Sequence, residues 1–293
     1  MILSRSLRIA MVAALWPANA FAYEVASGAE CRAMWQAFVD IVPIAFDDDD
    51  NPRDVPVTAT DDGWCRISGA APELQNAQFD TFDFRADGIN RLIVDGLPPR
   101  AVGLRFSDFL TEGPEPRAVD TVNITLSHDQ ASRTLLLENF EMLAPDGNRL
   151  QLTAVFNHLD LSNRGTMMMS LGGISLSQMA GVMDVVGGDD LFEARRKPRA
   201  DQEMFLQALP SLPESIADDD SKAALRAFLA ADTPDGTLTF SLLSARGIGF
   251  LQSMTGSFVN RVDTPEGVAR ALELMLDGAT VRFAWEPALT IEH

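Results

Sequence analysis

Apolar and polar residues alternate with a period of two along several stretches of this chain, and this pattern constrains the fold more than any other feature. Residues 102–106 place Val102, Leu104 and Phe106 on one side and Gly103 and Arg105 on the other. The stretches 121–127 and 150–156 repeat the pattern. Because successive side chains of a strand point to opposite faces, the alternation predicts a sheet with one apolar and one polar face.

Short turn sequences join these stretches. Pro145–Asn148 (PDGN) is a strong hairpin signal, and His128–Gln130 (HDQ) is expected to form a second turn. Short turns between amphipathic strands predict an antiparallel meander over about residues 77–177, in which the run Met167–Met169 leads into a further strand. Two more strands are expected near 237–242 and 280–286.

A few helices accompany the strands. Helical spacing of apolar residues predicts a helix over 29–42, a second from about 221 with Asp220 or Ser221 as its cap, and a third that begins at Pro265. The predicted fold is therefore α+β: a large curved antiparallel β-meander with a few packed helices and one disulfide. Residues 23–293 are expected to form a single domain whose weakest joint lies at 183–201.

The first 22 residues have the pattern of a secretory signal peptide. Arg5 and Arg8 precede the apolar run Ile9–Trp16, and Ala20–Ala22 supplies a small-x-small cleavage pattern. The apolar run is too short for a membrane anchor, so the chain after cleavage is not expected to span a membrane. We therefore expect residues 23–293 to be periplasmic.

The two cysteines, Cys31 and Cys65, are expected to form a disulfide, because an even number of cysteines in an oxidising compartment favours a bridge. It would join the first helix to a strand near residues 64–67. A redox or metal pair is the alternative, but the chain has no Cys-x-x-Cys motif and no histidine near either cysteine.

The charge balance narrows the choice of partners. A formal net charge of −19 repels phosphates, which excludes nucleic acid as a general partner and disfavours an anionic membrane surface. Calcium is the one cofactor considered, at Asp47, Asp48, Asp49 and Asp50. These acids are consecutive, whereas calcium loops space their acids at alternate positions, so a solvated loop is the preferred interpretation.

Two other groups of residues are candidate binding sites. Arg195, Arg196, Lys197 and Arg199 form a basic cluster that could dock an acidic partner or a phosphate headgroup, or could be an exposed loop that offsets nearby acids. A methionine-rich group is a candidate lining for an apolar ligand pocket, with ordinary core filling as the alternative. Its residues are Met167, Met169, Leu171 and Met179.

No catalytic residue is predicted. G-x-S-x-G is absent, and a histidine-based hydrolase would have to use His128 or His158, neither of which belongs to a known motif.

Residues 134–140, 144–152 and 236–242 are similar in style to the meanders of AsmA-like periplasmic proteins and of the uncharacterised alphaproteobacterial DUF2125 family. The resemblance implies a long curved sheet with an apolar concave face, associated with lipid handling or envelope maintenance. This chain departs from the AsmA pattern because it is short and lacks a transmembrane anchor.

Three hypotheses of function follow, in this order. The first is a non-enzymatic protein that binds a hydrophobic ligand or lipid on the apolar face of its sheet. The second is a structural protein of the cell envelope that interacts with another envelope protein. The third is a hydrolase.

Overall fold

A computed structural model describes residues 23, 25–41, 55–68, 77–111, 118–187, 199–231, 233–249, 252 and 264–288. The signal-peptide prediction for residues 1–22 lies outside this part of the chain. Within it, no helix is both long enough and apolar enough to cross a membrane.

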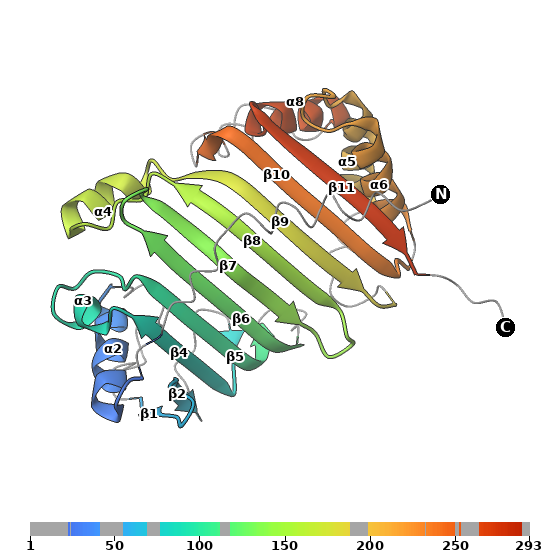
Figure 1. Ribbon diagram of the computed structural model, residues 1–293. Helices are drawn as coiled ribbons and strands as arrows, with labels where there is room; N and C mark the ends of the chain where they lie inside the picture. Colours follow the sequence, from blue (N-terminus) through green and yellow to red (C-terminus); the bar gives the residue numbers. More distant parts are fainter. Residues whose placement is uncertain are drawn as a thin grey trace, which may run out of the picture.

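One antiparallel sheet dominates the molecule, and its strands follow one another in space almost as they do in sequence (Figure 1). The order is β1-β2-β4-β5-β6-β7-β8-β9-β10-β11, and β3 pairs with β5 beside this path. The end strands β1 and β11 are not paired with each other, so the sheet is open. The bounds are β1 Val57–Ala59, β2 Cys65–Ser68, β3 Ala77–Gln78, β4 Thr81–Asp87, β5 Ala101–Thr111, β6 Ala118–Asp129, β7 Thr134–Leu143, β8 Arg149–Asn157, β9 Ser175–Val185, β10 Gly236–Gly249 and β11 Ala279–Pro287.

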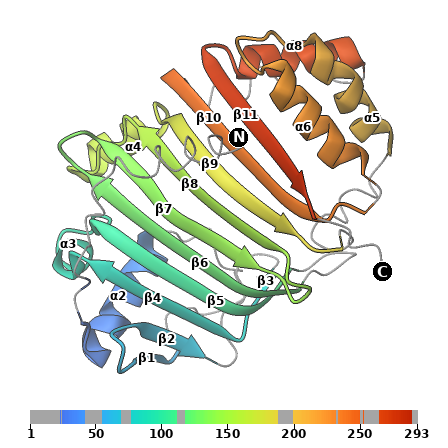
Figure 2. The ribbon, with the colours of Figure 1, turned by 45° about the vertical axis from the view of Figure 1, so that its right-hand side comes forward.

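The helices gather at the two ends of this curved sheet (Figure 2). At the first end lie α2 (Gly28–Ile41) and the short α3 (Ile89–Ile93). At the other end lie α5 (Arg199–Ala208), the 3-10 turn η4 (Leu209–Ser211), α6 (Asp219–Ala230) and α8 (Pro265–Met275). The small helix α4 (Arg164–Leu171) stands apart from both groups, beside the ends of the middle strands. The predicted α+β meander is confirmed.

Local chemistry explains most of these boundaries. The Pro145–Asn148 turn forms as expected, with Gly147 at a φ of 88°, a left-handed conformation that glycine adopts without strain. The hydroxyl of Thr264 caps α8 at the Gly267 amide, and Pro265 takes the first helical position. The cap of α6 is Asp218, not the expected Asp220 or Ser221, because its carboxylate accepts from the Ser221 amide at 2.9 Å.

The largest correction concerns residues 164–185. The run Met167–Met169 was expected to lead into a strand, but it lies in helix α4. Asn163 and Thr166 form a reciprocal capping box that starts this helix, and such a cap favours a helix where the apolar pattern alone does not. The strand begins only at Ser175, and β9 continues to Val185, beyond the expected end of the meander at 177.

The disulfide between Cys31 and Cys65 is present and joins α2 to β2, with 5.4 Å between the two Cα atoms. Both cysteines are fully buried in the first hydrophobic cluster, together with Met34, Trp35 and Ile67. The bridge therefore fixes the first helix on the strands that it covers.

Candidate functional site

A continuous row of apolar side chains crosses the whole sheet on one face. Register partners can be followed from β2 to β11, one residue on each strand, and all of them share one face because paired residues point the same way. The row is Ile67, Phe82, Phe106, Val122, Met142, Leu150, Met183, Leu238 and Trp285. We call this side of the sheet the apolar face.

Helices cover the two ends of the apolar face. At the first end, α2 and α3 bury Ile67 and Phe82 in a cluster in which the rings of Trp35 and Phe82 lie 6.1 Å apart, centroid to centroid. At the other end, η4, α6 and their neighbours bury Leu238 beside Phe228, whose ring lies 5.0 Å from that of Trp285. Both groups of helices therefore lie on the same face of the sheet.

The middle of the apolar face belongs to neither helical cluster. We call this region the open strip. Val122 and Ala154 within it are buried, and its other apolar side chains are half-buried. They are Ile124 and Leu126 on β6, Leu135, Leu137, Phe140 and Met142 on β7, and Leu150, Leu152 and Phe156 on β8. None of them is part of, or packed against, the hydrophobic clusters formed by the described residues.

Strand β7 shows most clearly that the middle of the sheet is uncovered. It lies at the centre of the sheet, yet each of its ten residues is only half-buried, on both faces. A central strand in a globular domain normally has at least one face packed against another layer. In the described part of the chain, no such layer covers β7.

An aromatic ring marks the boundary between the open strip and the second helical cluster. Phe240 on β10 lies across Gly181 on β9, its register partner, so closely that a Cβ atom at Gly181 would be 2.2 Å from the tip of the ring. The glycine therefore leaves room for the ring to lie flat on the sheet beside Leu152 of the open strip.

The opposite face of the sheet carries charged and polar side chains. Asp83 is 1% exposed and accepts from Arg66 Nε at 2.6 Å and from Arg105 Nε at 2.9 Å. Burial raises the pKa of the Asp83 carboxyl, but the two guanidinium groups outweigh this and hold the pKa below its ordinary value. Glu141 accepts from Arg149 Nε at 2.8 Å, and this bond lowers its pKa. We call this side the polar face.

Three of the four predicted ligand-binding residues lie on α4, away from the sheet clusters. Met167 is half-buried there, whereas Met169 is 76% exposed and Leu171 is 46% exposed; Met168 between them is 65% exposed. Met179 lies instead on β9 and packs against the cluster of Leu242 and Val281. The structure thus does not bring the four residues into one site.

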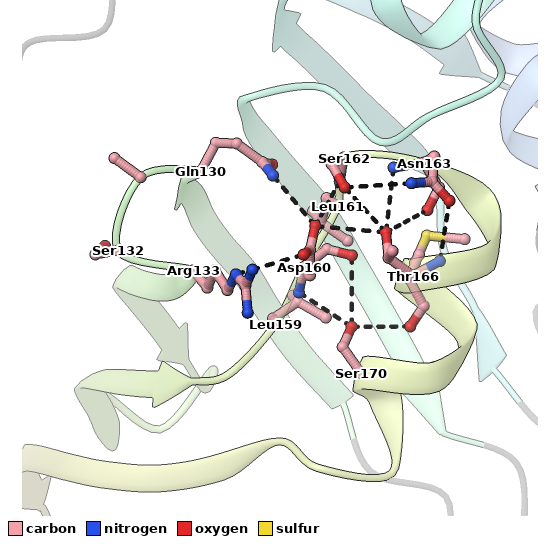
Figure 3. Close-up of polar contacts among 12 residues, drawn as sticks. Gln130, Ser132, Arg133, Leu159, Asp160, Leu161, Ser162, Asn163, Thr166 and Ser170 are labelled. Carbon is pink, nitrogen blue, oxygen red and sulfur yellow. Dashed lines mark hydrogen bonds and ion pairs between the residues drawn. The ribbon is translucent and has the colours of Figure 1, made fainter.

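Polar contacts, rather than apolar packing, hold α4 in place (Figure 3). Asp160 accepts from the Ser162 amide at 2.9 Å and from Gln130 Nε2 at 3.2 Å, and Arg133 Nε lies 3.4 Å away. Hydrogen bonds from Ser162 lower the pKa of Asp160 to about 2. The Asp160 amide in turn donates to the Ser170 hydroxyl on α4 at 3.0 Å.

We expect Asp160→Asn to loosen α4 without unfolding the sheet. Asparagine has one acceptor oxygen and no charge, so the contacts with Gln130 and Arg133 weaken, and the helix has no buried side chain to retain it. Hydrogen exchange should become faster at the amides of 167–171, with the melting temperature almost unchanged. Asp129→Asn is the matched control, because Asp129 caps the neighbouring turn at Ala131. Equal protection of α4 in both variants would contradict the expectation.

The two histidines considered for a hydrolase have different surroundings. His128 was expected in a turn, but it is the penultimate residue of strand β6, is buried, and contacts the Leu159 carbonyl through Nε2 at 2.9 Å. His158 Nδ1 lies 3.0 Å from the hydroxyl of Ser175, a residue that no sequence motif indicates. Ser175 is 6% exposed, and no carboxylate among the described residues contacts His158, so the pair lacks the third group of a triad.

The remaining sequence candidates cannot be placed. Asp47–Asp50 and Arg195–Lys197 lie outside the described residues, and Arg199 begins α5 but its side chain is not described. Among the residues that are described, no group of three or more His, Cys, Asp or Glu side chains is arranged to hold a metal ion.

Comparison with protein-family models, curated proteins and solved structures found no match for this chain. The function proposed below is therefore supported by the geometry of the chain itself.

Proposed function

We propose that this protein binds a hydrophobic ligand, the hydrocarbon chain of a lipid, on the open strip of its apolar face. The observation that carries the proposal is β7, a central strand whose ten side chains are all only half-buried. Water on such a surface is unfavourable, and each CH₂ group of a ligand removed from water there contributes roughly 0.8 kcal/mol. An apolar region of this kind, with structured elements on both sides, is typical of a binding surface.

The dimensions of the open strip fit acyl chains. From Leu135 to Met142 the strip extends over roughly 26 Å along β7, and the span from β6 to β8 adds roughly 10 Å across the strands. One leaflet of a bilayer contributes about half of a hydrocarbon core that is roughly 30 Å thick, so an acyl chain is about 15 Å long. The strip is therefore long enough for one acyl chain.

The charge of the chain supports recognition through the hydrocarbon part of a ligand. A net charge of −19 opposes binding that depends on an anionic headgroup. Lipid binding is consistent with the resemblance to AsmA-like proteins and with the expected export to the periplasm. The proposal includes both. The protein would then act as a carrier or holder of lipid outside the cytoplasm.

Two neighbouring leucines on β7 provide a matched test. Leu137 faces the open strip, because its partners are Leu126 and Ala154, whereas Leu136 is on the polar face opposite Ser127 and Val155. We expect Leu137→Asn to lower the lipid that co-purifies with the protein several-fold, and Leu136→Asn to leave it unchanged. Native mass spectrometry and lipid extraction of the full chain measure both.

The outcomes separate the hypotheses. A stoichiometric lipid that is lost only in the Leu137 variant supports the proposal. A wild-type protein that carries no lipid, and that gains none from vesicles of neutral phospholipid, overturns it and favours the interaction with an envelope protein. Equal loss in both leucine variants also counts against the open strip as the binding surface.

A further inference from the structure

An arginine on the polar face has no ionic partner although the chain is strongly acidic. Arg85 is on β4 between Phe84 and Ala86, both of which are buried under α2, so its own side chain projects from the other face of the sheet. Within the described part of the chain it makes no hydrogen bond and no ion pair. By contrast, neighbouring Arg66 and Arg105 both bind Asp83.

Two aromatic rings hold the Arg85 guanidinium. Its Cζ atom lies 3.9 Å from the centroid of the Tyr23 ring and 4.2 Å from that of Trp64. Trp64 also contacts Arg105, whose Cζ is 4.7 Å from the indole centroid. Contacts of this kind fix the plane of a guanidinium and leave its hydrogen-bond donors unused.

A glycine makes this arrangement possible. Gly103 is the register partner of Arg85 on β5, and a Cβ atom there would lie 3.0 Å from Arg85 Nε and 3.2 Å from Cη2 of Trp64. A larger residue would therefore require the guanidinium and the indole to shift by a few tenths of an ångström. The interior of a strand is an unfavourable place for glycine unless close approach requires it.

A buried polar atom without a partner lies at this place. Arg85 Nε is buried with no hydrogen-bond partner in the described structure, as is Arg91 Nε on α3, whereas the Tyr23 hydroxyl lies beside the side chain of Thr125. The two terminal nitrogens of Arg85 are not among the buried atoms that lack a partner, and the residue as a whole is half-buried. Buried polar groups without partners are rare in folded proteins, and an unoccupied ligand site is one explanation for them.

Arginines and carboxylates balance one another around Arg85. Arg66, Arg85 and Arg105 are accompanied by Asp83 and by Asp62, which lies 3.9 Å from Arg105 and is 60% exposed. Two further acids lie near Tyr23: Asp87 pairs with Arg100 at 3.2 Å, and Glu138 accepts from the Ser127 hydroxyl at 2.5 Å and keeps its negative charge.

We propose that the terminal nitrogens of Arg85, held between Tyr23 and Trp64, bind an oxyanion, a carboxylate or a phosphate, presented by a ligand. A planar guanidinium can donate from two nitrogens to two oxygens of a carboxylate or a phosphate. Partial removal of water from the site strengthens such charged hydrogen bonds. This site is on the opposite face from the open strip and is independent of the proposed lipid binding.

Nuclear magnetic resonance of the arginine Nε–H groups and of the Trp64 indole N–H tests this proposal in the full chain. We expect inorganic phosphate or acetate to shift the Arg85 and Trp64 signals saturably. A shift with phosphate alone indicates a phosphate ligand, and a shift with acetate alone indicates a carboxylate. If neither anion moves the Arg85 signal more than that of exposed Arg100, the proposal is wrong.

Two variants complete the test. Arg85→Gln removes the charge and the fork, and should abolish the response of Trp64 to the anion. Arg100→Gln removes an arginine that is 60% exposed and lies outside the aromatic contacts, and should preserve that response. A Trp64 response that survives in Arg85→Gln would also overturn the proposal. The wild-type titration decides the question even if a variant folds poorly.

Discussion

Replacing Asp83 with asparagine is expected to lower the free energy of unfolding by about 3 kcal/mol, the low end of the range for removing one partner of a buried ion pair. The side chain of Asp83 is 1% exposed and serves both Arg66 and Arg105. Those arginines are 39% and 34% exposed, so water can partly solvate them once the carboxylate is gone. Urea denaturation followed by circular dichroism measures the change.

The pH dependence of stability provides a second signature of Asp83. Its pKa is lowered in the folded state, so the ionised carboxylate stabilises the fold above the unfolded pKa of about 3.9, and this contribution is lost as the pH falls through the folded pKa. The asparagine variant should lose stability less steeply below about pH 4. Asp87→Asn is the control, because its partner Arg100 is 60% exposed and the pair contributes about 0–1 kcal/mol. If both substitutions change the free energy of unfolding by the same amount, burial of Asp83 does not strengthen its contribution to stability.

Removal of the disulfide should lower the free energy of unfolding by an amount similar to that expected for Asp83→Asn. The bond joins residues 34 apart, and closing a loop of that length restricts the unfolded chain by about 3–4 kcal/mol in the chain-entropy model. We expect the double variant Cys31→Ser/Cys65→Ser to lose about that much stability. The hydroxyls also replace sulfur in a fully buried apolar cluster, which adds to the loss.

The loss should be greatest at the first end of the sheet. In the serine variant, hydrogen exchange is expected to accelerate in α2, β1 and β2, while β9 and β10 keep their protection. Wild-type protein with its disulfide reduced is the control that separates loss of the bond from the burial of serine. A variant with wild-type stability, or one that loosens equally at both ends, would contradict a local role for the bridge.

Much of the fold could be predicted from the sequence because its signals are local. Alternation of Val102, Leu104 and Phe106 gives the face of β5 directly, and the PDGN turn sets the hairpin of β7 and β8. The cap at Thr264 and Pro265 likewise specifies the start of α8. Each of these depends on residues within one element or its adjoining turn.

The remaining features depend on contacts between distant residues. The methionine run became helix α4 through a cap at Asn163 and through Asp160, whose partners Gln130 and Arg133 are in another turn. The Arg85 contacts unite Tyr23, Trp64 and Gly103, which no spacing rule connects. Periodicity predicted the apolar faces of β5, β6 and β8, but it could not show that the helices cover only the ends of the sheet.

The sequential order of the strands affects how the chain folds during synthesis, when its N-terminus appears first. From β5 to β11 each strand pairs with the strand just before it in the sequence, so its partner has already been synthesised when it appears. Loop closure in such hairpins is short and entropically inexpensive, which favours stepwise growth of the sheet. Until the next strand arrives, the newest strand presents an unpaired edge, and the final β11 closes this growth with α6 packed beside it. If synthesis stalls within the meander, the partly formed sheet keeps an unpaired edge strand. This intermediate is therefore the species most prone to aggregation.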